Sequence, residues 1–158
     1  MGKKRAFFYT LLYLLFIVFL RFLVSGRILK LPVKEFLILS GGVLGAIVLD
    51  FEERLMIVLN QPSDKPVLRN VLSQIVLIFL AFYIGTSTVS LFPLSFVLGF
   101  LVRSLVEQYL ELQGITLVGL RGLSSWFWFL GQRPELQLQK IYLAILGFFV
   151  FYFSLTLV

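Results

Sequence analysis

Ionisable side chains gather at two places inside long apolar stretches of this sequence. The first is Asp50-Phe51-Glu52-Glu53-Arg54, which directly follows a run of apolar and small residues. The second is Arg103-Ser-Leu-Val-Glu107, where opposite charges stand four residues apart. Charges in apolar surroundings are costly, are usually paired and often mark a functional site. The candidate site residues are therefore Asp50, Glu52, Glu53, Arg103 and Glu107.

These residue types fit two kinds of site. Asp50, Glu52 and Glu107 could hold Mg²⁺ or Mn²⁺, since hard cations accept shells made of oxygen, and a bound metal can generate a nucleophile. Arg103 would then grip a substrate phosphate. Alternatively, Asp50, Arg103 and Glu107 form a structural ion-paired clasp. A guanidinium repels a metal and occupies carboxylates, so we expect the clasp and no cofactor.

Composition places the chain in a membrane. Of its 158 residues, 59% are hydrophobic, well above the usual share in soluble domains. The net charge is +6, and the charged residues flank apolar runs. We therefore expect them to set the orientation of the protein in the membrane, and we expect no nucleic-acid partner. Cys and His are both absent, which excludes thiolate and imidazole chemistry. We expect a single all-α integral membrane domain over residues 1–158, with the lipid bilayer and another membrane protein as partners.

The apolar runs predict about five transmembrane helices. They cover about residues 6–24, 35–50, 68–90, 94–112 and 141–158. The first is expected to be an uncleaved span and Phe92-Pro93 a turn. Two further helices, at 52–60 and 123–130, are expected in the membrane interface, with Trp126 and Trp128 as anchors at headgroup depth. The helix at 123–130 could also be re-entrant, so that it enters the membrane without crossing it.

Small residues in the second span indicate close helix packing. Gly41 and Gly45, like Gly42 and Ala46, are four residues apart, a spacing that lets two helix backbones approach in lipid. We expect the partner to be a neighbouring helix of the same chain.

The distribution of Lys and Arg predicts the orientation. With the N-terminus inside, nine lie in inner segments: Lys3, Lys4, Arg5, Arg54, Lys65, Arg69, Arg121, Arg133 and Lys140. Three lie in outer connections: Arg27, Lys30 and Lys34. This asymmetry predicts an inner-membrane protein with its N-terminus inside and its C-terminus outside. The second and fourth spans then both run inward, which puts Asp50, Arg103 and Glu107 in one leaflet.

The two charged stretches also carry a family resemblance. Leu49-Asp50-Phe51-Glu52-Glu53 is similar to the Leu-Pro-Asp-x-Asp-His segment of the membrane-bound metal-dependent hydrolase-like family, small multi-pass bacterial inner-membrane proteins. Arg103-Ser-Leu-Val-Glu107 stands where that family shows His-x-x-x-Asp. The resemblance implies a metal site, but Glu53 and Arg103 replace its histidines. It covers roughly residues 40–130.

From these observations we expect a non-catalytic structural, accessory or partner-binding membrane protein whose ion pairs clasp spans two and four. The alternative is a divergent membrane hydrolase that acts on a lipid-linked phosphate or ester. It would use carboxylates and a hard divalent cation.

Overall fold

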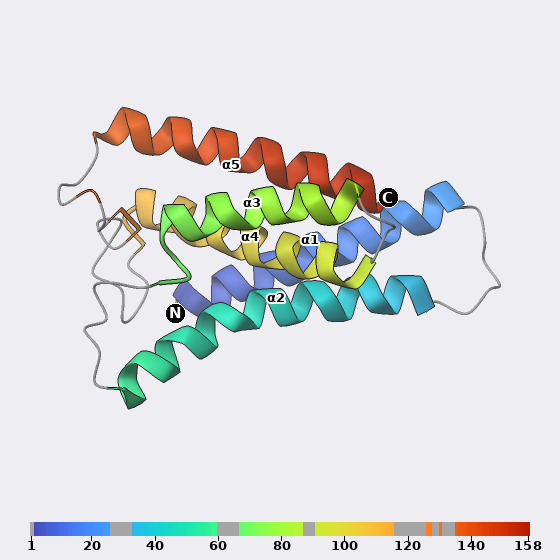
Figure 1. Ribbon diagram of the computed structural model, residues 1–158, viewed down its shortest axis with the longest axis horizontal. Coiled ribbons are helices and arrows are strands. Elements are labelled where there is room, and N and C mark those ends of the chain that lie inside the picture. The colour runs from blue at the N-terminus through green and yellow to red at the C-terminus, as the bar shows by residue number, and fades with distance from the viewer. Residues whose placement is uncertain are drawn as a thin grey trace.

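A computed structural model describes most of the chain as five α-helices (Figure 1). The described residues are 2–25, 33–59, 67–86, 91–115, 126–127, 130 and 135–158. The helices are α1 (Gly2–Ser25), α2 (Val33–Val58), α3 (Val71–Thr86), α4 (Leu91–Leu112) and α5 (Leu136–Leu157). Within these residues there is no strand, so the all-α prediction is confirmed.

Three of the helices are long and apolar enough to cross a membrane. They are α1 over Lys3–Val24, α4 and α5. Helix α3 is also apolar but is shorter, with Val71–Gly85 as its apolar part. Helix α2 has the length, but both of its ends carry ionisable side chains, such as Lys34 and Glu35 at its start.

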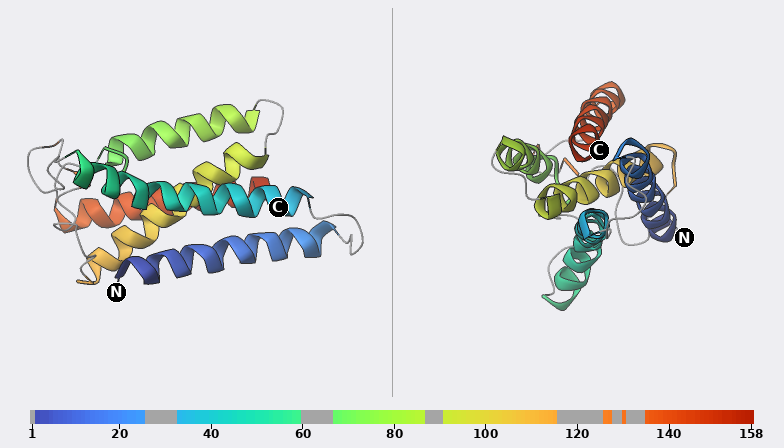
Figure 2. Two further views of the ribbon diagram at one scale, coloured as in Figure 1. Left: turned by 90° about the horizontal axis from the view of Figure 1, so that it is seen from below. Right: turned by 90° about the vertical axis from the view of Figure 1, so that its right-hand side faces the viewer.

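Helix α4 is the centre of the bundle. It contacts each of the other four helices, and the end-on view of Figure 2 shows them arranged around it. Most of α4 is buried, whereas most of α1 and α5 is not. Successive helices run in opposite directions, so the start of α1, the end of α2, the start of α3 and the end of α4 lie at one end (Figure 1).

The small residues of α2 allow it to approach α4 closely. A Cβ atom at Gly45 would overlap the carbonyl oxygen of Phe96, and one at Gly99 would overlap that of Gly42. On its other side, a Cβ at Gly42 would come 2.6 Å from the Leu14 side chain of α1. Ala46 is buried as well. In the structure, Gly41 and Gly45 lie against α4 and Gly42 lies against α1, all within the same chain.

Several helix bounds differ from those expected. Phe92 and Pro93 lie in the first turn of α4, not in a turn before it. Proline is well tolerated there because the first N–H groups of a helix have no partner within it. The helical extension predicted at 52–60 is part of α2, which continues without a break to Val58. Of the predicted aromatic helix at 123–130, only residues 126, 127 and 130 are described.

The opposite end of the bundle is held by Arg21. Its Nε lies 3.7 Å from Oε1 of Glu35 in α2, and its Nη1 donates a hydrogen bond to the carbonyl oxygen of Leu157. This side chain therefore links α1 to α2 and also satisfies a terminal carbonyl of α5.

Candidate functional site

Asp50, Arg103 and Glu107 meet between α2 and α4. The Nε of Arg103 donates to Oε1 of Glu107 at 2.6 Å, and its Nη2 donates to Oδ1 of Asp50 at 3.2 Å. Arg103 and Glu107 are both fully buried, whereas the Asp50 side chain is 37% exposed. The ring of Phe7 lies 5.7 Å from the Arg103 guanidinium carbon. The structure thus brings the three predicted residues together.

A second arginine completes this cluster. Arg69 Nε donates to Oε2 of Glu107 at 3.1 Å, and its Nη2 lies 4.0 Å from Oδ1 of Asp50. Each guanidinium therefore contacts both carboxylates, and each oxygen of Glu107 accepts from a different arginine. We call Asp50, Arg69, Arg103 and Glu107 the charge network. Its formal charge is zero.

Arg69 did not emerge as a site residue from the sequence, where it is one of several cations beside an apolar run. Charge balance is the signal that could have indicated it. Two buried carboxylates with one guanidinium leave a net negative charge, which is costly in apolar surroundings. A second cation at the same end was therefore required, and Arg54 and Arg69 were the nearest candidates from other segments.

Local hydrogen bonds fix Arg69 at the start of α3. Asn70 caps the helix, because its Oδ1 accepts from the Ser73 N–H at 2.7 Å. The next N–H, of Val71, donates to the Trp126 carbonyl oxygen at 3.0 Å. Residue 68 is held as well, since its N–H donates to Oε1 of Glu52 at 2.5 Å. The segment 67–71 is thus attached to α2 and residue 126 on either side of Arg69.

Of the other two acidic candidates, Glu52 and Glu53, the structure describes the side chain of Glu52 alone. Glu52 is buried and its carboxylate faces the backbone of Leu68. The side chain of Glu53 lies outside the described residues, and Arg54 is exposed.

Trp126 is fully buried, which differs from an aromatic ring placed among lipid headgroups. Its Nε1 donates to Oε2 of Glu111 at 2.9 Å, near the end of α4. A buried indole N–H needs such an acceptor. Trp128, the other predicted anchor, lies outside the described residues.

The alternative metal site would need Asp50, Glu52 and Glu107 around one point. Among the described residues, no group of three or more His, Cys, Asp or Glu side chains is placed to hold a metal ion. Both oxygens of Glu107 already accept from arginines, and Oε1 of Glu52 accepts from a backbone N–H. In this arrangement the carboxylates and the guanidinium groups neutralise each other's charge.

Comparison of the chain with protein-family models, with curated proteins and with solved structures finds no match. The resemblance to the membrane-bound metal-dependent hydrolase-like family therefore stays a prediction.

Proposed function

We propose that this chain is a multi-pass membrane protein of structural or accessory function, in which all five helices cross the bilayer. Large apolar side chains exposed on the outer helices support this setting. Examples are Phe16 on α1, Phe79 on α3 and Phe148 on α5, which are 54%, 70% and 63% exposed. Lipid, or another membrane protein, would cover these side chains.

The positions of basic residues support an orientation with the N-terminus in the cytoplasm. Six described cations belong to the end of the bundle where α1 begins: Lys3, Lys4, Arg5, Arg54, Arg69 and Lys140. At the other end, the described residues include Arg21 and Lys34. Lys and Arg accumulate on the cytoplasmic side of membrane proteins. The C-terminus, at the other end of the five-helix bundle, would then be outside.

The charge network is the main observation in favour of a non-catalytic role. It joins α2, α4 and the start of α3, so it can fix the order and register of three elements. Each oxygen of Glu107 already accepts a hydrogen bond from an arginine, so a metal ion or substrate at Glu107 would have to compete with a guanidinium group. In this proposal the network specifies which faces of the helices pair, the role of buried ionic groups that is best supported in other proteins.

Cysteine labelling tests the membrane topology, and the chain is suited to it because it has no native Cys. We expect a membrane-impermeant maleimide to label Lys34→Cys and Val158→Cys in intact cells. Glu135→Cys should react only after permeabilisation, because it precedes α5 at the cytoplasmic end. The native chain is the unlabelled control. The reverse pattern would contradict the orientation, and labelling of all three in intact cells would contradict a multi-pass protein.

Divalent cations distinguish the structural role from a hydrolase. We expect Mg²⁺ and Mn²⁺ at millimolar concentrations to leave the melting temperature of the purified protein in detergent unchanged, because the carboxylates are already paired with arginines. A ligand that binds only the folded state would raise it. The control is KCl of equal ionic strength. A rise with Mn²⁺ that Asp50→Asn abolishes would support the hydrolase and contradict the structural role.

A further inference from the structure

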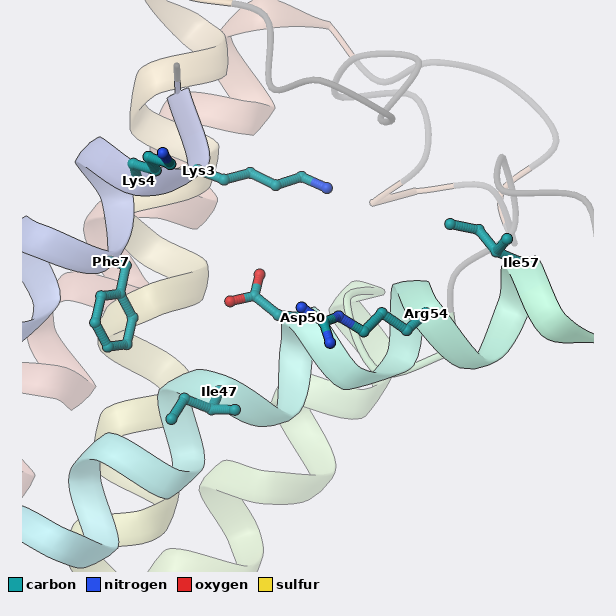
Figure 3. Close-up of a pocket in the computed structure, with 7 residues that line it drawn as sticks. All are labelled: Lys3, Lys4, Phe7, Ile47, Asp50, Arg54 and Ile57. Atoms are coloured by element: carbon teal, nitrogen blue, oxygen red, sulfur yellow. The ribbon is translucent and has the colours of Figure 1, made fainter.

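A cavity of about 570 Å³ opens beside the charge network, between the start of α1 and the second half of α2 (Figure 3). Its lining residues are Lys3, Lys4, Phe7, Ile47, Asp50, Arg54 and Ile57. The clasp between α2 and α4 requires no such cavity, and the proposed structural role does not use it.

The lining of the cavity is positively charged. Lys3, Lys4 and Arg54 bring three cations from two helices, against the single carboxylate of Asp50. That carboxylate is already neutralised, since Arg103 donates to it at 3.2 Å and Arg69 lies 4.0 Å away. Figure 3 shows the Lys3 side chain extended across the space between α1 and α2. The cavity therefore favours an anion.

The helix that carries the lysines also favours an anion at this place. Helix α1 begins with Gly2-Lys3-Lys4-Arg5, and its first turn contains no acidic residue. The N-terminus of a helix bears partial positive charge, so cations there are destabilising and an anion is stabilising. An anionic group in the cavity would offset both the lysine charges and the helix dipole.

The remaining walls of the cavity are apolar. They come from Phe7 of α1 and from Ile47 and Ile57 of α2. A small soluble anion would gain nothing from such walls. An amphiphile with an anionic head and hydrocarbon chains would use both parts.

We propose that this cavity binds the phosphate group of an anionic phospholipid, with the acyl chains along the apolar walls. Lysine and arginine donate charge-assisted hydrogen bonds to phosphate oxygens. Basic pockets on the cytoplasmic side of a helix bundle suit such headgroups. The inference rests on the proposed membrane setting and orientation, and it gives the accessory protein a specific lipid partner.

Native mass spectrometry of the detergent-purified protein tests this inference. The probes are phosphatidylglycerol and phosphatidylcholine with identical acyl chains. We expect tighter retention of phosphatidylglycerol, and about a fivefold loss of affinity for each of Lys4→Gln and Arg54→Gln. Arg5→Gln is the matched control, because Arg5 follows Lys4 in the same helical turn, is exposed and does not line the cavity. The affinity of the Arg5→Gln variant for phosphatidylglycerol should stay within twofold of the native value.

Three outcomes would overturn the inference. Equal retention of phosphatidylglycerol and phosphatidylcholine would mean that the negative charge of the lipid does not contribute to binding. Unchanged affinity in the Lys4→Gln/Arg54→Gln double variant, with an unchanged melting temperature, would place the lipid elsewhere. Displacement of the lipid by an equal concentration of inorganic phosphate would make this a site for soluble anions. Any of these with the expected cysteine-labelling pattern intact would overturn the lipid site and leave the membrane proposal standing.

Discussion

Glu107→Gln is expected to lower the free energy of unfolding in detergent by about 3–5 kcal/mol, the usual cost of removing one partner from a buried ion pair. Both oxygens of Glu107 accept from buried arginines, at 2.6 Å and 3.1 Å. The amide would remove the negative charge that both guanidinium groups share. Thermal or chaotrope unfolding in a nonionic detergent measures the loss.

The matched control for Glu107→Gln is Glu135→Gln, the same chemical change at an exposed position before α5. Asp50→Asn should fall between the two, since its side chain is 37% exposed and water can partly replace its partners. In the double variant Arg69→Gln/Glu107→Gln the remaining Asp50–Arg103 pair is neutral. Its loss should therefore be smaller than the sum of the single losses. Equal stability of Glu107→Gln and Glu135→Gln would contradict a stabilising network.

The meeting of Asp50, Arg103 and Glu107 could be predicted from the sequence because it depends on few facts. Helices of alternating direction place the end of the second and the end of the fourth at the same side. A buried arginine then needs carboxylates, of which Glu107 is one helical turn away and Asp50 is the first on the neighbouring helix. The glycine spacing predicted a close approach to a neighbouring helix of the same chain, without indicating which helix it is.

Charge balance leaves Arg54 and Arg69 as equal candidates for the second cation, and Trp126 has no such signal, because the contacts of Arg69 and Trp126 depend on how the segments between the helices pack against the bundle. Arg69 stands at the edge of an apolar run, a position that suits an interfacial cation equally well. Its burial requires the capped start of α3 to lie against Glu52 and Trp126. An indole suits both a headgroup region and a buried position with one acceptor. Pro93 was ambiguous for a similar reason, since proline is common in turns and in first helical turns.

Gly99→Ala is expected to destabilise the bundle by about 3 kcal/mol, at the upper end of the usual cost of overpacking. The added Cβ would overlap the carbonyl oxygen of Gly42, so the atom in its way belongs to the backbone and cannot rotate aside. Helices α2 and α4 would have to separate. Gly45→Ala should behave similarly, because its Cβ would overlap the Phe96 carbonyl oxygen.

Gly85→Ala and Gly147→Ala are the matched controls for this prediction. Both glycines are helical, and a Cβ at either would meet nothing within 4 Å. Alanine is better than glycine inside a helix by about 0.5–1 kcal/mol, so these two variants should gain stability where Gly99→Ala loses it. If the same Gly→Ala substitution raises stability at positions 85 and 147 and lowers it at position 99, the difference comes from the contacts of the added methyl group. A gain in stability for Gly99→Ala would contradict the close approach of α2 and α4.

The glycine contact and the charge network should not act independently. Gly99 precedes Arg103 by one helical turn on α4, and Gly45 precedes Asp50 on α2. Separation of the two helices at the glycines would therefore lengthen the 3.2 Å contact between Arg103 and Asp50. We expect the double variant Gly99→Ala/Asp50→Asn to lose less stability than the sum of its parts. If the two losses of stability simply add, the Arg103 side chain keeps its contact with Asp50 when the helix backbones move apart.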